Sequence, residues 1–291
     1  MSITLPGFNR LLMEFGSGFG IMAPVILFIY FRNRRKCAIL PLIAGIVAML
    51  GFAFGLEQFF HALIFSSPAG PVIQNNLALY AIYGGLAAGI FEELGRWVAF
   101  RFVLKDEYRE NDRNALMYGV GHGGVEMFLI LTVNYSTFLF YFSMIEGGGL
   151  EAVTQGMDAA AVQALTQQLT ALAESSPLMY VMAIVERVSA MLAQLSLSVL
   201  VWFSLGGKRE GDHRKYLFLA IGLHALLDAA SVLAAGLISN IQIVEIIILA
   251  LSLGVLYIAK RVWTAEHDPE QDRKLRGVKV GLLARRRAKK L

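Results

Sequence analysis

The stretch Phe91-Glu92-Glu93-Leu94-Gly95-Arg96 places two adjacent carboxylates and a guanidinium inside a long apolar segment. An ionisable side chain at membrane depth costs about 3 kcal/mol on insertion scales, so such residues need partners. On a helix, Arg96 lies one turn after Glu92 and Glu93, so it can pair locally with one of them. The other carboxylate needs a partner from elsewhere in the chain. We therefore expect the fold to bring further polar side chains to this stretch.

The overall composition is typical of a membrane protein that crosses the bilayer several times. Hydrophobic residues make up 56% of the 291 residues, which is far from a soluble composition. This composition predicts one all-α transmembrane helical bundle. The single cysteine, Cys37, excludes an internal disulfide, and no cysteine cluster suggests a structural zinc.

Seven apolar segments are long enough to cross a membrane as helices. They cover residues 15–31, 37–65, 74–100, 114–145, 178–205, 216–237 and 241–259. All Lys and Arg residues except Arg10, Arg96 and Arg187 fall in segments 32–36, 101–113, 206–215 and 260–291. Because basic loops stay in the cytoplasm, this pattern predicts the N-terminus outside and the C-terminus inside.

Two segments outside the spans carry predictions of their own. Residues 1–261 form the predicted bundle, and residues 262–291 form a basic cytoplasmic tail that we expect to contact anionic lipids and not nucleic acid. The outer loop 146–177 has no Lys or Arg, and Asp158 followed by an apolar stripe predicts a helix over about 158–173. That helix lies on the outer leaflet, covers the mouth of the bundle, or simply packs on it.

The depth of the polar residues predicts one shared site. Glu93, His122 and His224 each lie eight residues from a predicted cytoplasmic boundary, which is about 12 Å at 1.5 Å per residue. Glu126 and Asp228 follow the two histidines by one turn, so they lie deeper on the same faces. We therefore expect a polar cavity that opens toward the cytoplasmic half. Its predicted ring is Glu92, Glu93, Arg96, His122, Glu126, His224 and Asp228, with Gln194 as a further hydrogen-bonding partner.

These residue types suit the activation of water. A glutamate beside imidazoles can serve as a general base, whereas Arg96 stays charged and is expected to orient its neighbours. Glu126 and Asp228 are either ligands or acceptors that fix the histidine tautomers. Catalytic zinc takes three His or carboxylate ligands, so His122, Glu126 and His224 are candidate ligands. The chain lacks a His-Glu-x-x-His motif, so zinc rests on residue types alone.

Three other features have more ordinary interpretations. Gly119, Gly121, Gly123 and Gly124 surround His122, which indicates close helix approach, a loosened backbone or ordinary small-residue packing. Glu57 and His61 form another pair one turn apart, but no polar group is expected at their depth. Glu186 and Arg187 are expected to form a structural ion pair.

The motifs resemble those of known intramembrane proteases. Glu92-Glu93 with Arg96, Tyr118 four residues before His122, and His224 four residues before Asp228 are similar to the pattern of the CPBP proteases (CAAX-processing and bacteriocin-processing) and their PrsW relatives. Arg96 follows Glu93 by three positions where the CPBP pattern has four, and Tyr118 replaces a phenylalanine. The run Gly121-His122-Gly123-Gly124-Val125-Glu126 resembles the YhfC intramembrane metalloproteases most closely.

This resemblance implies hydrolysis of a peptide bond in a membrane-embedded or lipidated protein or peptide, in a prokaryotic plasma membrane. Glu92 and Glu93 would activate water, His122 and His224 would hold that water or a metal and stabilise the oxyanion, and Asp228 would support His224. Two other functions remain open. One is a proton-coupled transporter, although no inverted repeat is evident. The other is a non-catalytic membrane scaffold that recruits a partner helix.

Overall fold

The computed structural model describes residues 3–274, and these residues form helices and loops without a β-strand. Seven helical segments are long and apolar enough to span a membrane, which confirms the predicted span count. They are Gly7–Arg34, Leu40–Phe65, Leu77–Val103, Asn114–Gly148, Pro177–Ser204, Lys215–Leu237 and Ile241–Glu266. Of the predicted tail 262–291, with its expected lipid contacts, residues 275–291 lie outside the described residues, and α12 continues to Glu266.

Three of the spans are helices interrupted by short π-helical segments. The second consists of α2 (Leu40–Ala48), η1 (Met49–Glu57) and α3 (Gln58–Phe65). The third consists of α5 (Leu77–Val98) and η2 (Ala99–Val103), and the fourth of α6 (Asn114–Met127), η4 (Phe128–Val133) and α7 (Asn134–Gly148). Such wide turns recur near functional sites because they redirect the side chains that follow. The other spans are α1 (Gly7–Arg34), α10 (Pro177–Ser204), α11 (Lys215–Leu237) and α12 (Ile241–Glu266).

Local sequence explains where several helices begin. The side chain of Asn76 accepts a hydrogen bond from the backbone N–H of Leu79, and Asn240 caps α12 in the same way. Pro177 occupies the first turn of α10, where its missing N–H costs nothing. These caps lie in short turns, which favours antiparallel neighbours along the chain.

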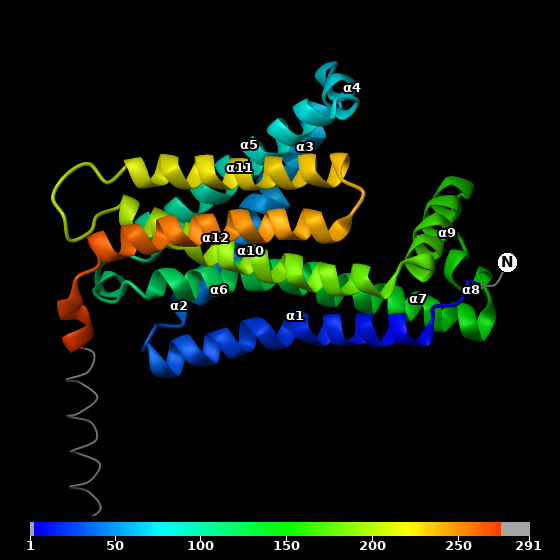
Figure 1. The fold of residues 1–291 in the computed structure, drawn as a ribbon, viewed down its shortest axis with the longest axis horizontal. Helices are drawn as coiled ribbons and strands as arrows, with labels where there is room; N and C mark the ends of the chain where they lie inside the picture. Colours follow the sequence, from blue (N-terminus) through cyan, green and yellow to red (C-terminus); the bar gives the residue numbers. More distant parts are fainter. Residues whose placement is uncertain (1–2, 275–291) are drawn as a thin grey trace, which may run out of the picture.

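The bundle has two distinct ends (Figure 1). The loops after α1, α5, α10 and α12 gather at what we call the basic end, where Asn111 donates to the carbonyl of Arg35 and Lys208 donates to that of Glu266. The opposite end, the α4 end, carries α4 (Ala69–Gln74), α8 (Glu151–Thr154) and α9 (Ala159–Glu174). A short 3₁₀ helix, η3 (Asp106–Glu110), lies in the loop before α6 at the basic end.

Helix α9 packs on the bundle. Asp158 caps it by accepting from the N–H of Ala161 at 2.8 Å. Leu169 is fully buried against a cluster that includes Met13, Phe142 and Tyr180, from α1, α7 and α10. The structure therefore shows α9 packed on the bundle, on the side of the α4 end where α1 and α7 lie.

Small residues set the spacing of the helices that carry the site. Helix α5 packs along α11, and α6 lies against both α2 and α10. A Cβ on Gly121 would lie 2.0 Å from the carbonyl oxygen of Leu42, so only glycine permits the observed approach of α6 to α2. Gly45 meets the carbonyl oxygen of Tyr118 in the same way. The glycines around His122 thus serve close helix approach, and the backbone there stays helical.

Candidate active site

The site begins with the two carboxylates of α5, which point to different partners. Glu92 Oε2 lies 2.9 Å from His122 Nε2 on α6 and accepts from Gln194 Nε2 on α10 at 3.1 Å. Both contacts use the same oxygen. No hydrogen bond within the described residues involves Oε1 of Glu92, and Glu92 lines a cavity of about 730 Å³. One oxygen is therefore anchored and the other is available to a molecule in the cavity.

Glu93 is fully buried and is not among the residues that line the cavity. Its Oε2 lies 3.0 Å from Arg96 Nε, and its Oε1 lies 2.7 Å from His224 Nδ1 on α11. Arg96 is also fully buried, so the two charges form an ion pair without water access. The local pairing expected for Arg96 thus occurs with Glu93 and leaves Glu92 to its partners on other helices.

Arg96 also fixes the orientation of Gln194. It donates to the backbone oxygen of Gln194 at 2.8 Å and to the side-chain Oε1 at 2.5 Å. Because Oε1 faces a donor that is always charged, the amide nitrogen must face the other way. That nitrogen donates to Glu92 and, at 3.3 Å, to Glu126 Oε2. Arg96 therefore acts on Glu92 through Gln194.

The two histidines present different faces to Glu92. His224 Nδ1 is held by Glu93, and its Nε2 lies 3.8 Å from Glu92 Oε2 and 3.6 Å from Asp228 Oδ2. These distances exceed a direct hydrogen bond, so Nε2 can contact a further molecule. His122 is also buried, and its ring stacks on that of Tyr118 at a centroid distance of 5.9 Å. Its Nδ1 has no partner among the described residues.

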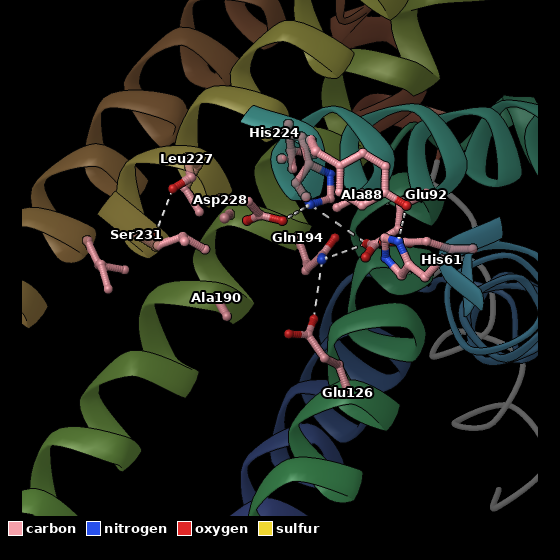
Figure 2. A pocket seen from close by; sticks show the side chains of 18 of the residues that line it. His61, Ala88, Glu92, Glu126, Ala190, Gln194, His224, Leu227, Asp228 and Ser231 are labelled. Carbon is pink, nitrogen blue, oxygen red and sulfur yellow. Dashed lines mark hydrogen bonds and ion pairs between the residues drawn. The ribbon is translucent and has the colours of Figure 1, made fainter. Parts of the chain in front are cut away.

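Figure 2 shows how the lining side chains converge from different helices. Glu92, Gln194, Glu126 and His224 come from α5, α10, α6 and α11, and Asp228 lies beside His224 on α11. The structure therefore brings together all the residues that we predicted for the site. Glu126 lies at the edge of this group, because Arg187 Nη1 donates to its Oε1 at 2.7 Å. Arg187 also pairs with Glu186, as expected for a structural ion pair.

The direction in which the cavity opens differs from our prediction. It extends from Glu92 toward the α4 end, past Glu57, His61 and Phe65 to Tyr80, which is 42% exposed. The prediction that it opens toward the cytoplasmic half is therefore wrong for the predicted orientation, in which the basic end is cytoplasmic.

Aromatic packing explains this reversal. Between the site and the basic end, three buried rings from α6, α10 and η2 fill the bundle. The ring of Phe100 lies 4.6 Å from that of Tyr118 and 5.1 Å from that of Trp202. We call these three residues the aromatic layer. It closes the bundle on the side where we expected the cavity to open.

Sequence reasoning missed or undervalued several residues of this site. Ser198 accepts a hydrogen bond from Arg96, and its place one turn after Gln194 on the same face of α10 could have indicated this. Glu57 and His61 were set aside for want of a polar group at their depth, yet both line the cavity. Tyr83 supplies that group, since its hydroxyl lies 2.7 Å from His61 Nδ1.

Comparison with known proteins gives the family. A family model described as the YhfC intramembrane metalloprotease matches residues 19–248. The chain is 32% identical over 248 residues to a Bacillus subtilis (strain 168) protein described as an uncharacterized membrane protein YhfC. This match covers 83% of the chain and 93% of the relative, whereas no solved structure matches the chain significantly. With seven apolar spans and a bacterial relative, the chain is a multi-pass membrane protein of prokaryotic type, and it belongs to the YhfC intramembrane metalloprotease family.

Proposed function

We propose that the chain hydrolyses a peptide bond of a membrane-embedded or membrane-associated protein or peptide, with Glu92 as the general base. The main support for this proposal is the hydrogen bonding of the Glu92 carboxylate. Donors from His122 and Gln194 hold Oε2, while Oε1 has no hydrogen-bond partner among the described residues and Glu92 lines the cavity. A base must be within reach of the proton that it removes, and this oxygen is placed for a water molecule in the cavity.

The proposed reaction balances with water as the only co-reactant. Glu92 takes a proton from water as the water oxygen bonds to the substrate carbonyl carbon. His224 Nε2 lies beside Glu92 and would stabilise the oxyanion, while His122 holds Oε2 of Glu92. Glu92 then returns the proton to the amide nitrogen as the C–N bond breaks, which releases an amine and a carboxylic acid.

The remaining polar residues position this group. Glu93 holds the His224 ring through Nδ1, so that Nε2 faces Glu92 and Asp228. Arg96 neutralises Glu93 and orients Gln194. From the sequence both glutamates were candidates to activate water. Because Glu93 is fully buried and engaged on both oxygens, we assign it a positioning role.

The family description names a metal, and the donor types suit zinc. His224 carries the outer-shell carboxylate that metal-binding histidines usually have, with Nε2 left free. His122 and His224 would hold the ion and Glu92 would stay free as the base, because Arg187 and Gln194 already engage the oxygens of Glu126. Within residues 3–274, no three His, Cys, Asp or Glu side chains are already arranged to hold one. A bound zinc would supply Lewis-acid stabilisation of the oxyanion.

The test is an inventory of new protein N-termini in membranes of a bacterial host that lacks its own copy of this protein. Cells producing the wild-type chain are compared with cells producing Glu92→Gln, which keeps the side-chain shape and removes the base. Glu245→Gln is a matched control, because Glu245 is a buried membrane carboxylate outside the cavity lining. We expect termini that depend on Glu92 and persist in the control. Identical termini in all three strains would refute the protease and favour a carrier or a scaffold.

A further inference from the structure

The cavity contains a second polar group that the proposed reaction does not use. His61 Nε2 lies 3.2 Å from Glu57 Oε1, and His61 Nδ1 lies 2.7 Å from the Tyr83 hydroxyl. A neutral His61 satisfies both contacts, with Nε2–H donating to Glu57 and Nδ1 accepting from Tyr83. The three residues form a continuous chain along the cavity wall between Glu92 and the α4 end.

Carboxyl side chains outnumber basic ones on this wall. Five carboxylates line the cavity, from Glu57, Glu92, Glu126, Glu186 and Asp228. Among the lining residues Arg187 is the one Lys or Arg, and its ion pairs with Glu126 and Glu186 leave it no free charge for the others. Two of the remaining carboxylates belong to the site around His224, and the third is Glu57. No Lys or Arg of the cavity lining therefore pairs with Glu57.

The surroundings of Glu57 indicate most clearly that a binding partner is missing from the cavity. Glu57 lies in a membrane span, and only 7% of the residue is exposed, so water has little access to it. Its Oε1 faces His61, whereas no hydrogen bond within the described residues reaches Oε2. Glu57 lines the cavity, so this oxygen is accessible from it, and a carboxylate at membrane depth is stabilised when a complementary cation pairs with it.

Aromatic rings surround the same part of the cavity. The Phe65 ring lies 5.3 Å from that of Tyr83, 5.7 Å from that of His61 and 6.3 Å from that of Tyr80. The faces of Tyr and Phe rings attract ammonium and guanidinium groups within about 6 Å. A carboxylate with several aromatic faces is the arrangement that recognises an organic cation, whereas an acidic or purely apolar group would leave Glu57 unpaired.

We propose that Glu57, with Tyr83, Phe65 and Tyr80, forms a subsite for a Lys or Arg side chain of the substrate. This rests on the proposed function and names its substrate class: a membrane-spanning peptide with a basic residue near the scissile bond, on the side toward the α4 end. The cation lies against Glu57 Oε2 and the ring faces. The reacting peptide bond then lies at Glu92, in the same cavity.

The test uses leucine–alanine transmembrane peptides of about 20 residues, acetylated and amidated so that one side chain is the only cation. Lysine, arginine or the uncharged norleucine is placed at successive positions of a fluorescent peptide in nanodiscs. Binding to the full-length chain is followed by fluorescence anisotropy in the Glu92→Gln background, where no cleavage is expected. The wild-type chain is assayed for cleavage in parallel.

At one register we expect the lysine and arginine peptides to bind at least tenfold more tightly than the norleucine peptide. Adding Glu57→Gln should abolish this preference and leave norleucine binding unchanged, while Glu245→Gln should keep it. Tyr83→Leu should reduce the preference severalfold and Tyr83→Phe should retain it, which tests the subsite even if Glu57→Gln does not fold.

Equal binding of the lysine and norleucine peptides at every register would overturn the subsite, as would a preference that survives Glu57→Gln. The proposed function fails separately. A lysine preference that depends on Glu57, without cleavage of any peptide by the wild-type chain, would support the subsite and count against the protease.

Discussion

Removing Arg96 should destabilise the bundle mainly because it leaves Glu93 as an unpaired buried charge. Arg96 Nε and Glu93 Oε2 are 3.0 Å apart and neither side chain is exposed. With about 4 Å between the charge centres and an effective dielectric constant of about 20, their attraction is about 4 kcal/mol. Loss of one partner of a buried pair typically costs about 3–5 kcal/mol. We expect Arg96→Met to lower the free energy of unfolding by at least that amount.

A double-mutant cycle isolates the pair. Arg96→Met also loses the hydrogen bonds to Gln194 and Ser198, but these losses occur in both Arg96 variants and cancel in the cycle. Glu93→Gln keeps an oxygen that can accept from His224 Nδ1. The double variant should therefore be about 2–4 kcal/mol more stable than the sum of the single variants predicts.

Unfolding by SDS in mixed micelles, followed by tryptophan fluorescence, measures these free energies. Arg101→Met is the matched control, because Arg101 lies at the basic end of the same span and is exposed. It should change stability by about 0.5 kcal/mol or less. A coupling energy below about 0.5 kcal/mol for Arg96 and Glu93 would refute the view that this pair holds the site together.

Three further predictions concern packing, reactivity and pH. Gly121→Ala should lower stability by about 1–3 kcal/mol in the same unfolding assay, whereas Gly222→Ala, which meets no atom within 4 Å, should not destabilise. Burial raises the pKa of the Cys37 thiol to about 12, so intact-mass spectrometry should show no N-ethylmaleimide adduct at pH 7.5 in mild detergent and one in SDS. The hydrogen bond from Arg113 lowers the pKa of Asp272. The stabilisation by this contact is therefore present above the unfolded pKa of about 3.9, and it is lost as pH falls through the lower folded pKa. The melting temperature of Asp272→Asn should therefore lie below that of the wild type at pH 7, and the difference should shrink as pH falls below about 3.9.

Hydropathy and the cost of burying charge were enough to predict much of the structure from the sequence. Seven apolar runs could be placed because each must satisfy its backbone within the membrane. The prediction that Glu93, His122 and His224 lie at one level followed from counting residues along straight helices. That count could not find the contact of His61 with Tyr83, because η1 precedes α3 and changes the direction of its side chains.

The direction in which the cavity opens could not be predicted from the sequence, for a different reason. Hydropathy marks Phe100, Tyr118 and Trp202 as apolar or amphipathic, but it does not distinguish rings that face lipid from rings that face each other. In the structure all three face inward and meet. Such an assignment depends on the rotation of each helix about its own axis, which packing decides.

The aromatic layer also bears on the side of the membrane from which water can reach Glu92. If the basic end faces the cytoplasm, as the sequence predicts, water would reach Glu92 from the α4 end of the cavity and not past Trp202. Protons of the outer medium would then have a route to the site, whereas protons of the cytoplasm would not. The bundle would thus connect the proposed site with the exterior of the cell and separate it from the cytoplasm.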